Sequence, residues 1–354
     1  LYSLEKYIDS SISFEDAEES VSHLHQIVLD IEEKVELEQP QESMQRISLF
    51  PPDEELDKYL PLGLNTAFDD EFKFSPRDLI LVGGRRGAGK SITCCNIANN
   101  VFESGKSAIY FTIEMDSREI LQRCCAIATG IAHDKLRKRT LSGTEWETVA
   151  AWWANRFVDA DEKLREYHDH RDFDRLHYEL KTNCELLPTQ QLDVVYDASL
   201  TISKIRAELD KKVKSAMEVG VVIVDYINQV KRSNLPSRAG QYDWTEQIEV
   251  SKALKSMAQE YEVPVYSPYQ IDATGEARFA KGILDAADAA FTIDTWKTED
   301  AIMSFNCTKM RSGKMGTFTS TMNWESLKIG PDTALTPDER EQEEHKTGEE
   351  INDI

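Results

Sequence analysis

The sequence lacks any apolar run long enough to cross a membrane. Runs such as Val219–Val224 fall far short of the roughly 20 consecutive apolar residues that a spanning helix needs. The start of the chain has no basic segment followed by an apolar one, so no signal peptide is predicted. With 40% hydrophobic residues, the composition lies in the range of globular proteins. We therefore expect a globular protein of the cytoplasm.

Cysteine is scarce, and its spacing does not suit zinc. The six cysteines form two adjacent pairs and two singles, with no C-x-x-C motif: Cys94, Cys95, Cys124, Cys125, Cys184 and Cys307. Reduced, buried thiols are the better interpretation. Three of the seven histidines, His168, His170 and His177, lie in a highly charged stretch, where an exposed helix face is favoured over a metal site. No structural metal is predicted.

Positive charge is also in short supply. With 41 Lys and Arg against 64 Asp and Glu, the formal net charge is −23 at pH 7, which argues against a protein that coats nucleic acid with its whole surface. A local basic channel is compatible with this balance. The acidic excess gathers in Glu15–Glu19, Glu32–Glu38, Asp53–Asp57 and the tail from Asp332. We therefore expect the ends of the chain to lie away from any bound nucleic acid.

The N-terminal segment, residues 1–40, has apolar residues at the spacing of an amphipathic helix: Val21, Leu24, Ile27, Val28 and Ile31. It is too short to be a domain. Prolines punctuate residues 41–62, which predicts a linker to a compact domain over 63–330. A helix packed on the chain's own core is an equally open alternative for the N-terminal segment. The polar, acidic residues 331–354 are predicted to be disordered.

From Asp78 onward, short β-rich runs alternate with helical ones. Strands are predicted at Leu79–Val82, Ala108–Ile113, Val194–Tyr196, Val221–Val224, Val263–Ser267, Ala290–Ile293, Met303–Cys307 and Phe318–Asn323. Helices are predicted over 90–104, 117–129, 201–218 and 245–261. This alternation indicates an α/β fold, with a mostly parallel twisted sheet and covering helices. The stretch at about 144–192 is tryptophan-rich, charged and too long for an ordinary connection, so we expect a helical elaboration there.

The strongest motif is a phosphate-binding loop. Gly84–Ser91 matches G-x-x-x-x-G-K-[ST] and stands between an apolar strand and a helical stretch, a setting that argues against a chance match. Backbone N–H groups of such a loop close on phosphate oxygens, and the helix N-terminus adds its dipole. Lys90 is expected to contact the β- and γ-phosphates and Ser91 to ligate Mg²⁺. The predicted nucleotide-contacting residues are Gly84, Arg85, Arg86, Gly87, Ala88, Gly89, Lys90, Ser91 and Ile92.

Two carboxylates end predicted strands. Asp225 follows the apolar run Val221–Val224, where open α/β sheets bind ligands, and is the candidate second ligand of Mg²⁺. Glu114 follows Tyr110–Ile113 and is the candidate group that orients and deprotonates the attacking water. A turn residue at 225 and a helix cap or surface residue at 114 are the structural alternatives. The nearby phosphate loop favours the catalytic interpretation of both.

The order of these motifs resembles the DnaB family of replicative helicases over roughly Tyr59–Ile329. The resemblance is carried by the phosphate loop, by Gln270 and by a series of short pieces: Tyr59–Leu64, Arg77–Val82, Ile113–Met115, Val224–Tyr226, Ser251–Lys255, Val263–Val265 and Thr308–Gly313. It implies a RecA-like nucleotide-binding core. The same resemblance implies that the protein comes from a bacterium or a phage. It also implies a homo-oligomeric ring, expected to be a hexamer, with ATP at subunit interfaces and single-stranded DNA in the pore. Primase and a helicase loader are possible partners.

The resemblance also assigns roles to residues near the end of the domain. It implies that Gln270 senses the γ-phosphate and links it to DNA-contacting loops, although Pro268–Tyr269 stands where the family has Leu-Ser. Lys309 and Arg311 match a phosphate contact and an arginine finger that reach the ATP of a neighbouring subunit. Residues two apart on a strand face the same way, so both cations can reach one ligand. Without the resemblance, they are two cations at a solvated strand end.

Two loops are candidates for the DNA contact, because they follow Asp225 and Gln270 and carry cations among Gly and polar residues. They are Lys231–Tyr242 and Asp272–Lys281, with Lys231, Arg232, Arg238, Arg278 and Lys281 as the DNA-binding residues. Ordinary surface loops with a few cations are the alternative. The expected function is ATP-driven unwinding of duplex DNA by a ring moving on single-stranded DNA. The rivals are another RecA-type DNA ATPase, such as a recombinase or packaging motor, and a non-catalytic ring protein switched by ATP.

Overall fold

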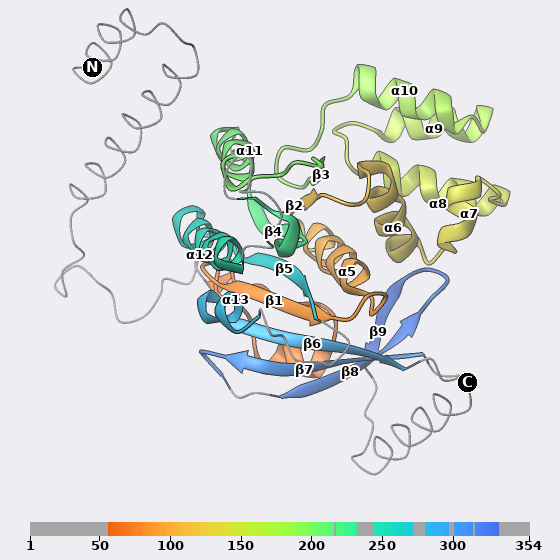
Figure 1. Ribbon diagram of the computed structural model, residues 1–354. Helices are drawn as coiled ribbons and strands as arrows, with labels where there is room; N and C mark the ends of the chain where they lie inside the picture. The colour runs from red at the N-terminus through yellow and green to blue at the C-terminus, as the bar shows by residue number, and fades with distance from the viewer. Residues whose placement is uncertain are drawn as a thin grey trace, which may run out of the picture. The chain divides into compact units, whose positions relative to one another are not determined.

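The computed structural model of the chain describes residues 56–215, 217–231, 244–271, 280–296, 301–313 and 316–332 (Figure 1). All of these residues except Leu56 belong to one compact unit, which starts at Asp57. No helix within these ranges has both the length and the apolar character needed to span a bilayer.

A nine-stranded sheet forms the centre of the described unit, in the order β3-β2-β4-β5-β1-β6-β7-β8-β9. The strands are β1 (Leu79–Gly84), β2 (Ser107–Thr112), β3 (Leu192–Tyr196), β4 (Val219–Asp225), β5 (Val265–Gln270), β6 (Ala289–Trp296), β7 (Ile302–Met310), β8 (Thr317–Asn323) and β9 (Lys328–Asp332). Pairing is parallel from β3 to β6 and antiparallel from β6 to β9. The carboxyl ends of β1, β2, β4 and β5 therefore share one edge of the sheet.

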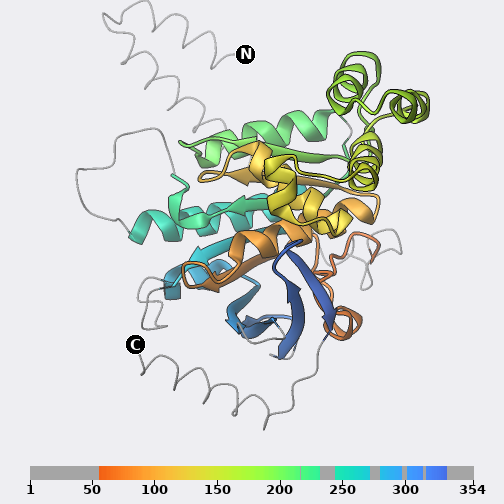
Figure 2. The same ribbon diagram turned by 90° about the vertical axis from the view of Figure 1, so that its right-hand side faces the viewer.

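Helices cover both faces of the parallel part of the sheet (Figures 1 and 2). On one face lie α5 (Lys90–Glu103) and α6 (Ser117–Thr129), and on the other lie α11 (Ile202–Lys214), α12 (Trp244–Tyr261) and α13 (Ala280–Ala286). Successive residues of β1 alternate between the two cores: Ile80 packs on the first face and Leu81 on the second. Every residue of β1 is buried, as expected of a central parallel strand.

The predicted elements agree with this arrangement, with extensions at strand ends. The clearest extension is β5, which was predicted to stop at Ser267 but continues through Pro268 to Gln270. Val265 donates its N–H toward the β1 side, so by alternation the nitrogen of residue 268 faces β4. The ladder between β5 and β4 ends at Tyr266. Proline, which has no backbone N–H, is tolerated at 268 because β4 offers no hydrogen-bond acceptor at this position of the ladder.

The expected elaboration between β2 and β3 is helical. It contains α7 (His133–Lys138), α8 (Gly143–Ala154), α9 (Asp161–His170) and α10 (Phe173–Asn183), which lie toward the β3 side of the sheet (Figures 1 and 2). Its core includes Tyr167, Leu176 and Leu180. The buried Arg156 stacks 3.5 Å above the ring of Trp152 and donates to that residue's carbonyl.

The ends of the domain differ from the predicted boundaries. Leu60 and Leu62, which were predicted to lie in the linker, are buried. Leu60, before α4 (Thr66–Glu71), forms a β-bridge with Phe74, after this helix. At the other end, β9 was not predicted, and it includes the first two residues of the expected disordered tail. The carboxylate of Asp332 accepts the N–H groups of Thr66 and Ala67 at 2.8 and 3.0 Å. Residues 333–354 lie outside the described ranges.

Candidate functional site

The phosphate loop connects β1 to α5 at the carboxyl edge of the sheet, as predicted. Gly87 and Gly89 have φ angles of 83° and 90°, a left-handed conformation that favours glycine. Gly89 is also the N-cap of α5, so the N-terminus of a 14-residue helix opens directly onto the loop. Lys90 folds back over the loop and donates to the carbonyls of Gly84 and Arg85, each at 2.8 Å. The loop therefore combines left-handed glycines with a helix N-terminus, a setting that favours an anion.

Asp225 ends β4 and is almost fully buried beside the loop. Its carboxylate accepts a hydrogen bond from the Tyr110 hydroxyl at 2.7 Å and another from the Ser91 hydroxyl. Burial raises the pKa of Asp225, and the Glu114 charge raises it further, while the hydrogen bonds from Tyr110 and Ser91 oppose this shift. A carboxylate in such surroundings gains from a nearby cation.

The Lys90 ammonium is part of the same electrostatic arrangement. Burial lowers its pKa, and the charges of Asp225 and Glu114 act in the opposite direction. Cys94, one turn further along α5, is fully buried, and its pKa is raised by burial and then by Asp225. The thiol therefore stays neutral and packs as a core residue. The prediction of buried thiols holds for Cys94, Cys95, Cys124 and Cys125, whereas Cys184 and Cys307 are only partly buried.

A cavity of about 490 Å³ brings the predicted nucleotide residues together. It is lined by Arg86, Gly87, Gly89, Lys90, Ser91, Ile92, Glu114, Arg123, Asp225, Tyr226, Gln229 and Gln270. Gly84 and Ala88 lie in the same loop without lining the cavity, and Arg85 contributes its carbonyl to Lys90. The cavity thus joins the phosphate loop to the ends of three neighbouring strands.

Glu114 reaches this cavity because β2 lies next to β4. Thr112, the last residue of β2, is the register partner of Asp225, and the N–H of Ile113 donates to the Asp225 carbonyl at 3.2 Å. Glu114 follows immediately, before α6, and is exposed. Its side chain borders the cavity, and no hydrogen bond of its carboxylate is described. A group that orients water needs a carboxylate that is available to accept from that water.

Gln270 ends β5 directly opposite the start of the loop, because its register partner is Gly84. Its N–H donates to the side chain of Asn228 at 3.0 Å, while the Gln270 side chain is exposed at the cavity. The replacement of Leu-Ser by Pro268–Tyr269 therefore leaves the glutamine at the nucleotide cavity.

Arg123 also lines the cavity, although it was not among the predicted site residues. It lies on α6 and pairs with Glu119 at 2.7 Å, one turn earlier on the helix. Its Nε is buried and has no hydrogen-bond partner within the described part of the chain. A signal was available, since Arg123 follows Glu114 on the first helix after β2, whose amino end faces the site. Cavity-lining Tyr226 and Gln229 were also overlooked, although both follow Asp225 closely.

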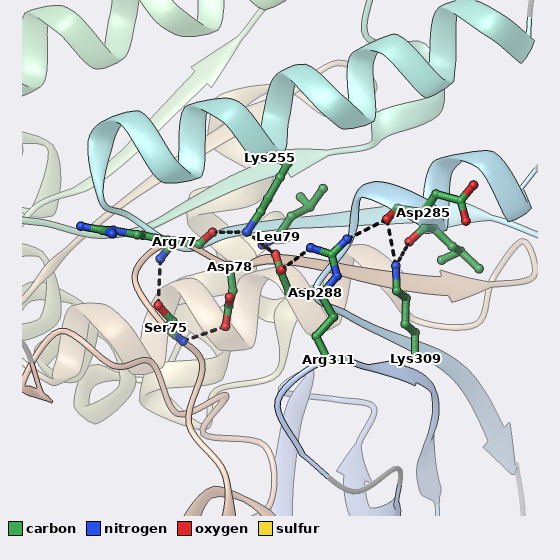
Figure 3. A network of polar contacts seen from close by, with 10 residues as sticks. Ser75, Arg77, Asp78, Leu79, Lys255, Asp285, Asp288, Lys309 and Arg311 are labelled. Atoms are coloured by element: carbon green, nitrogen blue, oxygen red, sulfur yellow. Dashed lines mark hydrogen bonds and ion pairs between the residues drawn. The ribbon is translucent and has the colours of Figure 1, made fainter. Parts of the chain in front are cut away.

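Lys309 and Arg311 lie in a polar network with Asp285 and Asp288, beside Leu79 at the start of β1 (Figure 3). Lys309 lies in β7, and Arg311 follows Met310, the last residue of that strand. Because β7 runs antiparallel to β6, both residues lie near the amino end of β1, roughly 17 Å from its carboxyl end. Both side chains donate to one acceptor within the chain, the carbonyl of Asp285. Their contact with a nucleotide stays a prediction. Neither lines the nucleotide cavity of its own chain.

Most of the candidate DNA-binding residues cannot be placed. Arg232, Arg238 and Arg278 lie outside the described ranges, and only the backbone of Lys281, in α13, is described. Lys231 is exposed. It follows the short turn after β4, and its backbone forms an isolated β-bridge with Thr201. The assignment of both loops to DNA therefore stays a prediction.

The donor set at the cavity fits Mg²⁺ held together with nucleotide phosphates. Ser91 and Asp225 both line the cavity and would supply two hard oxygen ligands. Within the described ranges, no cluster of three or more His, Cys, Asp or Glu side chains could hold a metal by protein ligands alone. This pattern suits a cation that completes its shell with water and phosphate oxygens.

Comparison with known proteins gives a consistent result. Residues 63–282 match the family model described as DnaB-like helicase C terminal domain. The chain is 26% identical over 210 residues to the replicative DNA helicase DnaB of Nostoc sp., covering 59% of the chain and 20% of that protein. It is 23% identical over 283 residues to DnaB of Buchnera aphidicola subsp. Baizongia pistaciae, covering 74% of the chain and 54% of that protein. The chain thus spans between a fifth and about half of these relatives.

Two solved structures share the fold. The ATPase domain of G40P superposes with a TM-score of 0.58 at 16% sequence identity, over 88% of this chain and 99% of that one. A DnaB-like replicative helicase, solved in a study of its interactions with primase, also gives a TM-score of 0.58 at 16% identity, over 93% of this chain and 74% of that one. The α/β, RecA-like fold predicted from the sequence is confirmed.

Proposed function

Because the chain belongs to the family of DnaB-like helicase C-terminal domains, we propose that it is the ATP-driven motor of a replicative DNA helicase. It assembles as a ring, expected to be hexameric, moves along single-stranded DNA in the pore and unwinds the duplex ahead. The shared family and the fold both support this proposal. Membership of the family implies the use of a nucleotide, and the phosphate loop favours ATP with Mg²⁺.

The observation that carries the proposal is the separation of two groups of residues within one chain. Lys90, Asp225 and Glu114 meet at one edge of the sheet, whereas Lys309 and Arg311 lie at the other. A single chain therefore holds one part of an ATPase site and offers cations that its own site does not use. A ring joins these parts, because each subunit can present one edge to the opposite edge of the next.

Hydrolysis in such a site is chiefly a matter of positioning and charge. Lys90 would bind the β- and γ-phosphates, and Ser91 and Asp225 would hold Mg²⁺, which would supply positive charge next to the phosphates. Glu114 orients the attacking water and accepts its proton. Gln270 contacts the γ-phosphate, and Arg311 and Lys309 of a neighbouring subunit bind the charge that develops during transfer. A guanidinium suits this task because its planar N–H groups bind two oxygens at once.

DNA is expected to lie against the two loops that follow Asp225 and Gln270. Lys231, Arg232, Arg238, Arg278 and Lys281 supply the positive charge that an acidic protein must concentrate along the strand. Primase is a candidate partner, since a structural relative was solved in a study of its interactions with primase. A helicase loader is a second candidate partner.

The test is unwinding of a forked DNA substrate by the purified protein, together with its ATPase rate and its mass in solution. We expect ATP-dependent strand separation, stimulation of hydrolysis by single-stranded DNA and a ring-sized assembly. Strand exchange between homologous duplexes in place of unwinding would identify a recombinase. Nucleotide binding with negligible turnover, even with DNA present, would identify a ring switched by ATP binding alone.

A further inference from the structure

Asp288 sits at the centre of the polar network that holds Arg311 (Figure 3). It precedes β6 and is only 8% exposed. One carboxylate oxygen accepts the Arg311 guanidinium at 3.1 Å, and the backbone carbonyl of Asp288 accepts the N–H of Arg311 at 2.9 Å. The other carboxylate oxygen accepts the Lys255 ammonium at 2.7 Å and the N–H of Leu79 at 2.8 Å. The Asp288 side chain thus pairs with Arg311 and Lys255 and also accepts a backbone N–H from β1.

The end of α13 completes this network. The carbonyl of Asp285 accepts the second terminal nitrogen of Arg311 at 3.0 Å and the Lys309 ammonium at 3.0 Å, and the carbonyl of Leu284 accepts Lys309 at 2.6 Å. Carbonyls in the last turn of a helix have no partner within the helix and carry partial negative charge. Cations are therefore their natural ligands.

We propose that Asp288, together with the carbonyls of Leu284 and Asp285, is a finger clamp that positions Arg311 and Lys309 for the ATP of the neighbouring subunit. This inference rests on the proposed ring, in which these two cations act in trans. Asp288 is a positioning residue, because it acts through Arg311 and touches no phosphate. The clamp extends the site beyond the residues that bind the nucleotide.

The Arg311 side chain is held in place within the chain and still has N–H donors for an external ligand. Its two terminal nitrogens are engaged at Asp288 and Asp285, yet 48% of the side chain is exposed. A guanidinium has five N–H donors, and the two side-chain bonds of Arg311 use two of them. The others can point at phosphate oxygens outside the chain. An arginine without these contacts would have to lose its rotamer freedom on each encounter.

The clamp is also anchored to the strand that carries the phosphate loop. Asp288 binds the N–H of Leu79, the first residue of β1, while Gly84 at the other end of β1 begins the loop. All six residues of β1 are buried, so the strand is a rigid spacer. The distance between the finger and the chain's own nucleotide site is therefore fixed. A displacement of about 1 Å in a catalytic group can cost ~100-fold in rate.

The test compares ATP hydrolysis by the full chain with Asp288→Asn, Arg311→Ala and the double variant, all in the presence of single-stranded DNA. Asp288→Asn keeps the volume but removes the charge, so we expect kcat to fall about 10- to 100-fold, in the range seen when supporting residues are lost. The KM for ATP should change less than about twofold, because binding by the chain's own loop is untouched. The double variant should be no slower than Arg311→Ala alone.

Two further variants separate positioning from folding. Lys255→Met removes the other cation on Asp288 but leaves the pair with Arg311, so it should keep kcat within about threefold even if the melting temperature falls. Asp288→Glu keeps the charge and moves the carboxylate by one methylene, so it should slow hydrolysis in a folded ring.

The possible outcomes are distinct. Wild-type kcat in both Asp288 variants, with Arg311→Ala inactive, would overturn the clamp and leave the proposed finger in place. Wild-type hydrolysis by Arg311→Ala would overturn the finger itself, and with it this part of the proposed function. Equal losses of kcat in Lys255→Met and Asp288→Asn, matched by equal losses of stability, would assign the network to folding and overturn the clamp.

Discussion

The ring of Tyr269 lies against the backbone of Gly83, its register partner on the neighbouring strand. A Cβ atom at position 83 would lie 2.5 Å from the Cζ and 2.6 Å from the hydroxyl oxygen of Tyr269. Tyr269 is 2% exposed, so its ring cannot swing into solvent. Glycine next to the phosphate loop therefore makes room for a large side chain where the resembled family has serine.

Gly83→Ala should therefore destabilise the domain by about 1–3 kcal/mol through overpacking. Tyr269→Ser should also destabilise it, since it leaves a cavity. In the double variant, the new methyl group occupies part of that cavity, so the combined loss should be smaller than the sum of the two by about 1 kcal/mol or more. Urea unfolding of all four proteins measures this coupling. Additive losses would show that the two positions do not share space.

Lys90→Ala should abolish ATP turnover and leave the fold intact, because the side chain serves phosphate and contacts only loop carbonyls. The rate of phosphate release and the melting temperature are the measurements. Lys181→Ala, on the exposed surface of α10, is the matched control and should keep wild-type values of both. Near-normal hydrolysis by folded Lys90→Ala would refute the assignment of the loop.

Arg311→Ala and Glu114→Ala should each lose hydrolysis by at least about 100-fold and still bind nucleotide. Their mixture distinguishes action in cis from action in trans. In a mixed ring, an Arg311→Ala subunit keeps Glu114 and can receive Arg311 from an adjacent Glu114→Ala subunit, so some complete sites should return. Hydrolysis is measured against the mixing ratio. Absence of recovery in verified mixed rings would argue that Arg311 does not act across the interface.

Replacement of Arg232, Arg238, Arg278 and Lys281 together by alanine should weaken binding of single-stranded DNA. Each lost phosphate contact removes about 0.7 from the slope of log affinity against log salt. Basal ATPase should largely survive, whereas stimulation by DNA should fall, because the loops follow Asp225 and Gln270 without supplying the phosphate site. Binding at several salt concentrations and ATPase with and without DNA are the measurements. An unchanged slope with intact stimulation would place DNA elsewhere.

Asp69 should make the stability of the domain depend on pH. Burial raises its pKa from 3.8 to about 6, despite the opposing N–H groups of Leu62 and Gly63. The folded state therefore favours the protonated form, and the resulting stability is fully present below pH 3.8 and lost as pH rises through about 6. After allowance for solvent screening, the loss is about 1–2 kcal/mol.

Asp69→Asn cannot ionise, so its free energy of unfolding should vary less between pH 4.5 and 7.5 than that of the wild type. Urea unfolding at three pH values in this window gives the comparison, and the slope matters more than the absolute stability. Parallel curves for the two proteins would mean that Asp69 titrates in its ordinary range.

The local part of the nucleotide site was predictable because it depends on short, ordered signals. The phosphate loop, Asp225 and Glu114 each follow an apolar strand, and parallel strands bring their carboxyl ends to one edge. The sequence places Arg123 on the helix after Glu114, but its position at the cavity depends on the angle at which α6 leaves β2. Arg311 lies at the opposite edge because β7 runs antiparallel to β6. The alternation of strand-like and helical segments in the sequence does not reveal the direction of a strand.

Long-range pairing explains the remaining differences in the fold. The predicted strand Val263–Ser267 stops before Pro268, whereas the observed strand continues to Gln270. Pro268 is acceptable within β5 because the ladder with β4 ends at Tyr266. The last strand, β9, contains glycine and proline and has a weak pattern of its own. It is held by register with β8 and by its contact with α4, neither of which a local signal encodes.

The contact between Asp332 and the start of α4 sets a practical boundary for engineering this domain. The carboxylate of Asp332 caps the N–H groups of Thr66 and Ala67, so the two ends of the described fold meet. A fragment that stops before residue 332 would expose the first turn of α4 and release β9 from its neighbour. A tag or fused domain attached just beyond residue 332 would emerge beside α4, at the far end of the sheet order from β3.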